Sequence, residues 1–304
     1  MAEQGGRPTA DAETWTVLRL ILWSAEYLGG KGVERARLDG EYILAHALGL
    51  GRLDLYLQYD RPLTPDELNA FRPLLKRRAA REPLQYILGS QPFRELDLEV
   101  DRRVLIPRPE TEVLVGEVLD WARAYGHGDL EALDVGTGSG AIALSLALEG
   151  PFRRVVGTDL TQDAIEVATL NRASAGLEGR VDLRLGEDYT AIAADERFDV
   201  IVSNPPYVAE GERDTLEPEV ADWEPGTALF AGIDGLDVVR RLIAGAPARL
   251  RDGGLLALEV GAGQAGAVAG LLEGRGGWDG ITVRADLTGR ERIVMATRAA
   301  ARID

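Results

Sequence analysis

Residues 133–147 read LDVGTGSGAIALSLA, and their pattern of apolar residues and glycines predicts the class of the fold. It opens with apolar residues that predict a buried strand, continues through glycines at 136, 138 and 140, and ends in an apolar segment that predicts a helix. Glycines between a strand and a helix let the backbone turn sharply and approach a ligand at the helix N-terminus. The stretch therefore predicts a strand–loop–helix unit of a ligand-binding α/β domain.

The spacing of these glycines restricts the class of ligand that the loop can bind. Nicotinamide-binding loops prefer G-x-G-x-x-G, and phosphate-binding Walker loops require Gly-Lys-Ser/Thr. This loop is G-x-G-x-G with Asp134 just before it. That variant suits S-adenosylmethionine, which has no pyrophosphate and carries positive charge on its ammonium and sulfonium groups. A tight turn without a ligand is the alternative interpretation.

The segments around this stretch alternate between strand and helix patterns. Helical patterns include 141–148 and 161–175, and apolar strand candidates are 132–135, 154–158, 181–185, 199–203, 255–260, 281–285 and 292–297. This alternation is typical of a doubly wound, mostly parallel α/β sheet.

Residues 14–88 have a different pattern. Apolar residues recur at helical spacing from Val17 to Leu28, and Thr64-Pro65-Asp66-Glu67 is a capping box with proline at the first helical position. We therefore expect a small all-helical domain over 1–88, an extended connector over 89–103 and an α/β domain over 104–304.

Composition excludes several classes of protein. The 304 residues include no cysteine and only two histidines, which argues against disulfide frameworks, thiolate zinc sites and cysteine nucleophiles, and we expect no metal. No signal peptide or membrane span is evident, so a cytoplasmic protein is expected. Residues 1–88 are neutral, so the whole net charge of −16 lies in 89–304. A basic cluster in the first part, predicted to be a solvated helix face, comprises Arg72, Lys76, Arg77, Arg78 and Arg81.

Polar side chains follow the next two predicted strands. Asp159 ends one strand, where a carboxylate can bond ribose hydroxyls, as in other doubly wound nucleoside sites. Asp188 and Tyr189 follow the strand after it, where Asp188 can accept from an adenine amino group and Tyr189 can cover the ring. Each alone is a common turn residue, but their order at successive strand ends predicts a nucleoside pocket.

Asn204-Pro205-Pro206-Tyr207 directly follows the apolar strand FDVIVS. The prolines stiffen the backbone around Asn204. Its side-chain oxygen and the Pro205 carbonyl can each accept one N–H of an amide or exocyclic amine, which aims the nitrogen lone pair at a methyl donor, while Tyr207 packs on the planar group. A plain Asn-Pro turn is the alternative.

Together these segments resemble the release factor glutamine N5-methyltransferases, the PrmC/HemK family. The resemblance covers essentially the whole chain. It rests on the glycine stretch and on PLQYILG at 83–89, VLIPRPETEVLV at 104–115, FDVIVSNPPYV at 198–208, EP-x-x-AL-x-AG-x-DGL at 224–236, GGLLALEVGAGQ at 253–264 and DLTGRERIV at 286–294.

The resemblance implies a seven-stranded Rossmann-like methyltransferase domain with a final antiparallel strand. It implies methylation of the glutamine in the Gly-Gly-Gln loop of class 1 peptide-chain release factors, with S-adenosylmethionine converted to S-adenosylhomocysteine. The implied site residues are Asn204, Pro205, Pro206 and Tyr207 for the substrate glutamine, and Gly136, Thr137, Gly138, Ser139, Gly140, Asp159, Asp188, Tyr189 and Asn204 for the cofactor. The family often has tryptophan where this chain has Tyr189. Arg108 and Glu110 are candidates for a wall over the site or for an ion pair at the domain junction.

Three alternatives remain at this stage. A ribosomal-protein glutamine methyltransferase shares NPPY but is less similar over IPRPETE. A DNA or RNA amino-methyltransferase presents the same amine geometry, and a non-catalytic cofactor-binding protein is the third. Acidic residues after NPPY would repel phosphates and argue against a nucleic-acid substrate; they are Glu210, Glu212, Asp214, Glu217, Glu219, Asp222 and Glu224. No membrane partner is expected.

Overall fold

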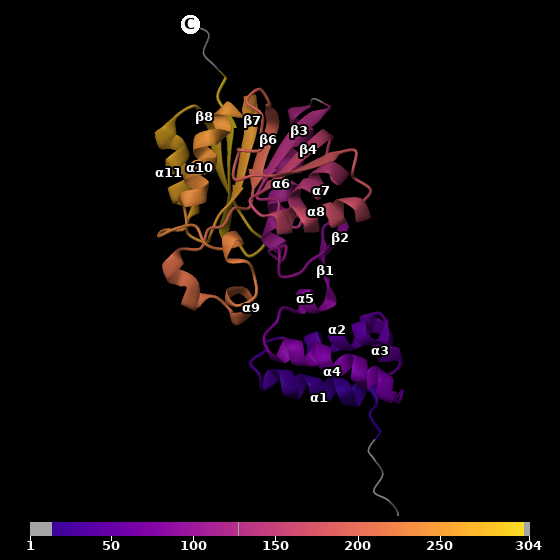
Figure 1. The fold of residues 1–304 in the computed structure, drawn as a ribbon. Coiled ribbons are helices and arrows are strands. Elements are labelled where there is room, and N and C mark those ends of the chain that lie inside the picture. Colours follow the sequence, from indigo (N-terminus) through magenta and orange to yellow (C-terminus); the bar gives the residue numbers. More distant parts are fainter. Residues whose placement is uncertain (1–13, 127, 301–304) are drawn as a thin grey trace, which may run out of the picture. The chain divides into compact units, whose positions relative to one another are not determined.

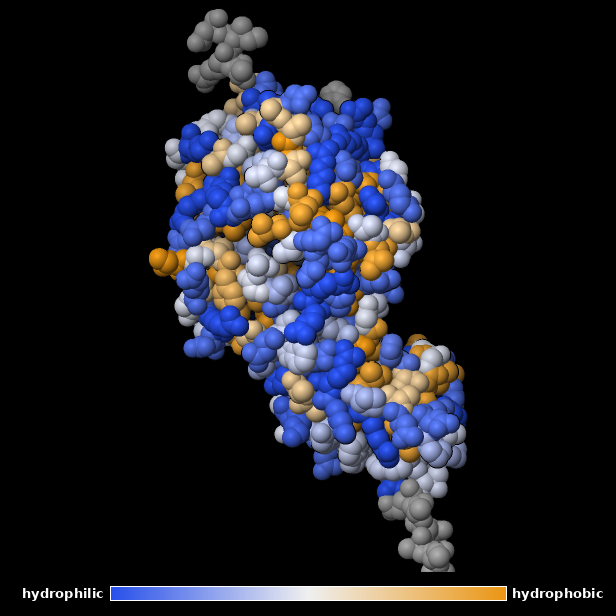
Figure 2. All heavy atoms as spheres, in the orientation of Figure 1, coloured by the Kyte–Doolittle hydropathy of each residue, from blue (hydrophilic) through white to orange (hydrophobic). Residues whose placement is uncertain are grey.

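The computed structural model describes residues 14–126 and 128–300, and the ends of the first and last expected domains, 1–13 and 301–304, lie outside them. The chain forms two compact units that divide between Leu88 and Gly89 (Figure 1). On the face in view, hydrophilic residues cover most of both units (Figure 2). No helix among the described residues is long and apolar enough to cross a membrane.

The first unit is helical, as expected. Gly49, in the left-handed region at φ 64°, ends the second helix, and the Thr64 hydroxyl caps the fourth by accepting from the Glu67 backbone at 3.3 Å. Apolar side chains of these helices share one core. The helices are α1 (Val17–Gly29), α2 (Ala36–Leu48), α3 (Arg52–Leu57), α4 (Pro65–Ala79) and α5 (Leu84–Leu88).

Two arginines of the basic cluster form ion pairs within this unit. The buried Arg78 guanidinium donates to Asp39 at 2.7 Å, and Arg77 pairs with Glu82 at 2.6 Å. Arg78 is therefore not part of a solvated helix face, because its charge is compensated in the interior by a buried carboxylate.

The second unit begins with an antiparallel hairpin within the stretch expected to be a connector, followed by the α/β sheet. The order in the seven-stranded sheet is β5-β4-β3-β6-β7-β9-β8. The first five strands pair in parallel, and β9 is antiparallel to both its neighbours, which confirms the predicted fold class. The elements are β1 (Ser90–Phe93), β2 (Leu96–Glu99), α6 (Pro109–Tyr125), β3 (Leu130–Val135), α7 (Ala141–Glu149), β4 (Phe152–Asp159), α8 (Gln162–Ser174), β5 (Val181–Leu185), β6 (Phe198–Ser203), α9 (Pro218–Ala221), α10 (Asp237–Gly245), β7 (Leu250–Glu259), α11 (Ala265–Arg275), β8 (Trp278–Ala285) and β9 (Glu291–Arg298).

Side chains alternate between two cores, one on each face of the sheet. On β6, Val200 and Val202 belong to the core under α6 and α7, whereas Ile201 belongs to the core under α10 and α11. Figure 1 shows the same division of the helices. The central strands are buried on both sides, so they read as continuous apolar runs rather than as alternating ones.

This topology positions the site. The chain proceeds outward from β3 to β4 and β5, then returns to place β6 on the other side of β3. Ligands of doubly wound sheets bind beyond the carboxyl ends of the strands at such a switch point. The glycine loop follows β3, and NPPY follows β6, so the two motifs meet there.

Candidate active site

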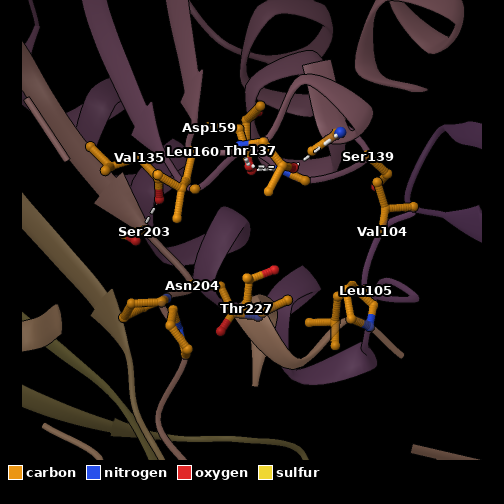
Figure 3. A pocket seen from close by; sticks show the side chains of 18 of the residues that line it. Val104, Leu105, Val135, Thr137, Ser139, Asp159, Leu160, Ser203, Asn204 and Thr227 are labelled. Carbon is orange, nitrogen blue, oxygen red and sulfur yellow. Dashed lines mark hydrogen bonds between the residues drawn. The ribbon is translucent and has the colours of Figure 1, made fainter. Parts of the chain in front are cut away.

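A cavity of about 160 Å³ lies at this switch point, entirely within the second unit. The glycine loop, the end of β4 and the first residues of NPPY all contribute to its wall. Figure 3 shows Thr137 and Asp159 on one side of the cavity and Asn204 and Thr227 on the other. The structure thus brings together the two strongest sequence motifs.

The glycine loop leaves room for a ligand. Gly136 and Gly138 have φ of +76° and +55°, and a Cβ at either position would meet no atom within 4 Å. Because both residues line the cavity, a side chain there would occupy space that the ligand needs. Gly140, in contrast, packs closely against Leu144 at the start of α7.

Asp134 holds this loop in place through hydrogen bonds. Its Oδ2 accepts from the Thr137 hydroxyl at 2.7 Å and from the Ala143 backbone N–H at 3.1 Å, which joins the loop to the first turn of α7. Asp134 is fully buried, and this desolvation raises the pKa of its carboxyl to about 7. Its role is to shape the loop.

Asp159 ends β4 and lines the cavity. Its Oδ2 accepts from the Gly138 backbone N–H at 3.0 Å, and its Oδ1 accepts from the Thr161 backbone N–H at 3.0 Å. A carboxylate oxygen can accept more than one hydrogen bond, so Asp159 keeps acceptor capacity for hydroxyl groups in the cavity.

Asp188 and Tyr189, adjacent in sequence, lie in different environments. Asp188 lines the cavity at φ 48°, and its Oδ2 accepts from the Arg241 guanidinium at 2.6 Å. Tyr189 is not a lining residue: its hydroxyl donates to the Leu242 carbonyl at 2.9 Å, and its ring packs over Gly245 of α10. Tyr189 therefore packs against the core under α10 and α11, because α10 offers both an apolar surface and an acceptor.

Asn171 of α8 is a clamp that the sequence analysis missed. Its Nδ2 donates to the carbonyls of Ser139 and Glu99, at 2.9 and 3.0 Å, and its Oδ1 accepts from the Glu99 N–H at 2.7 Å. A buried polar residue inside an amphipathic helix is the signal that could have indicated it. The clamp joins the glycine loop to the end of β2.

We expect Asn171→Ala to lower the free energy of unfolding by about 2 kcal/mol, because the buried Ser139 carbonyl loses its partner. Denaturant titration measures the change. The matched control is Asn69→Ala, which removes an exposed asparagine and should leave stability unchanged. Equal stability of both variants would contradict the clamp.

NPPY stands between two cavities. Asn204, Pro205 and Pro206 line the first, and Asn204 and Tyr207 line a second cavity of about 270 Å³. Gln264 holds the loop by donating to the Tyr207 carbonyl at 3.0 Å. Gly235 lies against the same carbonyl, where an added Cβ would stand 2.2 Å from the oxygen, so only glycine fits there.

A chain of hydrogen bonds through two buried residues holds the side chain of Asn204. Its Nδ2 donates to the Thr111 hydroxyl at 3.0 Å, and that hydroxyl donates to Glu259 Oε2 at 2.7 Å. In the sequence, Thr111 is notable only as part of IPRPETE, and no motif distinguishes Glu259. An acid at the end of the apolar run 255–258 was the available signal.

Arg108 and Glu110 do not pair with each other. The Arg108 guanidinium donates to Glu224 at 2.5 Å, and Glu224 is buried, so this pair connects the start of α6 to the segment after NPPY. Arg108 also lines the second cavity. Glu224 therefore does not belong to the exposed acidic surface that the sequence suggested.

The first cavity fits S-adenosylmethionine. Two glycines leave open space for the ligand, and the Asp159 carboxylate suits ribose hydroxyls. Apolar side chains such as Leu105, Ile142 and Leu160 complete the wall. Arg103 and Arg241 also line it, but each is paired with an acid, so neither offers a free charge to a phosphate. Among the described residues, no cluster of acids and histidines is arranged to hold a metal ion.

Comparison with known proteins places this geometry in a family. The PrmC N-terminal domain model matches residues 19–89, and the methyltransferase small domain model matches residues 114–219. The chain is 46% identical over 286 residues to the release factor glutamine methyltransferase of Geobacter sulfurreducens, covering 94% of this chain and 98% of that protein. This chain belongs to the release factor glutamine methyltransferases. A second release factor glutamine methyltransferase, from Rhodopirellula baltica, is 38% identical over 96% of this chain and 99% of its own length.

Solved structures support the fold of this methyltransferase. The hMettl16 catalytic domain in complex with an RNA hairpin superposes with a TM-score of 0.56 at 19% identity, covering 74% of this chain and 81% of that one. A methyltransferase from Pyrococcus furiosus superposes with a TM-score of 0.50, also at 19% identity, covering 68% and 90%. At this identity the likeness establishes the α/β methyltransferase fold alone.

Proposed function

We propose that this enzyme transfers a methyl group from S-adenosylmethionine to the side-chain nitrogen, N5, of the glutamine in the Gly-Gly-Gln loop of class 1 release factors. The observation that carries the proposal is the position of Asn204, which lines both cavities at once. A group bound in the first cavity and an amide entering from the second would therefore meet beside Asn204. The names of the relatives supply the substrate protein.

The residues of the two cavities divide between the two ligands. Gly136 to Ser139 and Asp159 hold the cofactor, which when bound supplies a methyl group on a positively charged sulfur. The Asn204 side-chain oxygen and the Pro205 carbonyl each accept one N–H of the glutamine amide. This directs the nitrogen toward the first cavity, and such orientation lowers the barrier without chemical activation of the amide.

Proton removal requires no dedicated base in this scheme. A methylated amide nitrogen that still carries both hydrogens is strongly acidic, so water accepts the proton. Tyr207 packs beside the planar group, and its burial raises the pKa of the phenol, so it remains protonated at neutral pH. The reaction takes place where release factors act, in the cytoplasm.

The test is incubation of the purified enzyme with methyl-labelled S-adenosylmethionine and a purified release factor, followed by mass-spectrometric mapping. We expect one label on the Gly-Gly-Gln glutamine and none on naked RNA or DNA. Label on a ribosomal protein or a nucleic acid instead would replace the proposed substrate.

The exposed acids after NPPY, in the segment 210–222, should steer the substrate. We expect a loop that contacts ribosomal RNA to have basic residues on both sides, and an acidic surface attracts such residues. We expect the quadruple variant Glu210→Gln, Asp214→Asn, Glu217→Gln and Asp222→Asn to raise KM for the release factor several-fold, while cofactor affinity stays unchanged. Salt should weaken recognition by the wild type more than by this variant.

The control for this prediction neutralises four exposed acids outside the segment: Asp195, Glu178, Glu273 and Asp279. It changes the net charge by the same amount. If it raised KM as much as the first variant does, the effect would come from overall charge, and the acidic segment would have no specific role.

A further inference from the structure

The hydrogen-bonded chain behind Asn204 has a defined direction. Thr111 and Glu259 are 3% and 1% exposed, so water does not compete for their polar atoms. Glu259 Oε2 accepts from the Thr111 hydroxyl at 2.7 Å, and the hydroxyl oxygen accepts from Asn204 Nδ2 at 3.0 Å. The chain joins β7, α6 and the loop after β6, three segments far apart in sequence.

This direction follows from how many hydrogens each group can donate. An ionised carboxylate can only accept hydrogen bonds, so Thr111 must donate its single hydroxyl hydrogen to Glu259. The hydroxyl oxygen is then left as an acceptor, and only the NH₂ end of the Asn204 amide can satisfy it. The Asn204 oxygen consequently faces away from Thr111.

We propose that Thr111 and Glu259 are positioning residues that present the oxygen, rather than the nitrogen, of the Asn204 amide to the substrate. The inference rests on the proposed function, in which that oxygen accepts an N–H of the glutamine. If the Asn204 amide were flipped, its NH₂ group would face the substrate NH₂ group, and two donors cannot bond each other. This chain of hydrogen bonds from Glu259 through Thr111 to Asn204, called the relay below, therefore selects the productive orientation of Asn204.

The charge state of Glu259 controls the relay. Arg108 and Glu110 near the start of α6, Tyr207 after β6 and Arg292 of β9 act on Glu259 electrostatically. Within the described residues, Arg108 is bound to Glu224 and Arg292 lies 3.7 Å from Asp286, so neither forms an ion pair with Glu259.

Burial consequently raises the pKa of Glu259 to about 7. Above this value the carboxylate accepts from Thr111. Below it the protonated acid can donate to Thr111, whose hydroxyl hydrogen is then free to turn toward Asn204. A hydroxyl that donates to Asn204 favours the flipped amide, so acidification should reverse the direction of the relay.

The kinetic test uses Thr111→Val, which keeps the shape of the side chain and removes the hydroxyl. We expect kcat to fall roughly 10-fold from lost orientation of Asn204, while cofactor affinity measured by calorimetry stays unchanged. Thr111→Ser restores the hydroxyl and should recover most of kcat. A Val variant as fast as the wild type, or a Ser variant as slow as the Val variant, would overturn the relay.

A second readout does not depend on turnover. The chain has only three asparagines, Asn69, Asn171 and Asn204, so selective ¹⁵N-asparagine labelling gives few side-chain NH₂ signals, and Asn204→Ala identifies the third. We expect the Asn204 signal to shift with a midpoint near pH 7 in the wild type and to lose this midpoint in Glu259→Gln. The Asn69 signal is the internal control.

Asp134 is the competing source of such a midpoint, because burial raises its pKa to about 7 as well. A midpoint that survives Glu259→Gln would assign the titration to Asp134 and overturn the role of Glu259. A wild-type enzyme that labels no release factor would instead remove the proposed function. The NMR titration would then still decide the relay, so the two failures are distinguishable.

Discussion

Asn204→Ala should reduce turnover by at least ~100-fold, the scale expected when a reacting group loses its orientation. Asn204 lies where the two cavities meet, and its amide oxygen is directed by a buried partner rather than by solvent. Single-turnover methylation of a release factor measures the change, and calorimetry with S-adenosylhomocysteine should show a far smaller loss of affinity than of turnover.

The pairing of these two readouts makes the prediction specific. Loss of turnover together with loss of cofactor affinity would indicate a collapsed site rather than lost positioning. Turnover close to that of the wild type would remove Asn204 from the mechanism, and with it the assignment of NPPY as the substrate motif.

Asp159→Ala has the largest expected effect on cofactor binding. A hydrogen bond to a charged group contributes roughly 1.5–3 kcal/mol, so affinity for S-adenosylmethionine should fall about 10- to 150-fold. The carboxylate also accepts from the Gly138 N–H, so the substitution additionally loosens the loop that surrounds the cavity. Calorimetric titration with the cofactor measures the loss.

Asp163→Ala is the matched control. It removes an exposed carboxylate from the first turn of α8 that does not line the cavity, so affinity should change little. If Asp159→Ala bound the cofactor as tightly as this control, the ribose role assigned to the end of β4 would be wrong.

Much of the fold could be predicted from the sequence, and the candidate site was expected at the carboxyl ends of the strands. The glycine stretch predicted where β3 ends and where α7 begins, and the strand predicted over 181–185 matches β5. These predictions depend on local rules, because apolar runs, caps and glycine spacing act over a few residues. The same rules located Asp159 and Asn204 at strand ends, where the topology gathers them.

Contacts between distant segments could not be predicted in the same way. Nothing near Tyr189 indicates that a carbonyl of α10 would accept its hydroxyl, and nothing near Thr111 indicates that Glu259, 148 positions later, would be its partner. Whether a polar residue faces a ligand or the core is decided by which helix covers it, and that is a property of the whole sheet. Arg78 shows the same limit, since its burial depends on Asp39, which lies on another helix.

The position of β9 between β7 and β8 determines the order in which a newly made chain can complete its site. The residues that line the first cavity lie between Arg103 and Arg241, so all of them have been synthesised by residue 241. The strand that carries Glu259 remains an open edge until residues 291–298 arrive to pair with it. During translation, the residues around the methyl donor are therefore all present about fifty residues before the strand that pairs with the Glu259 strand begins.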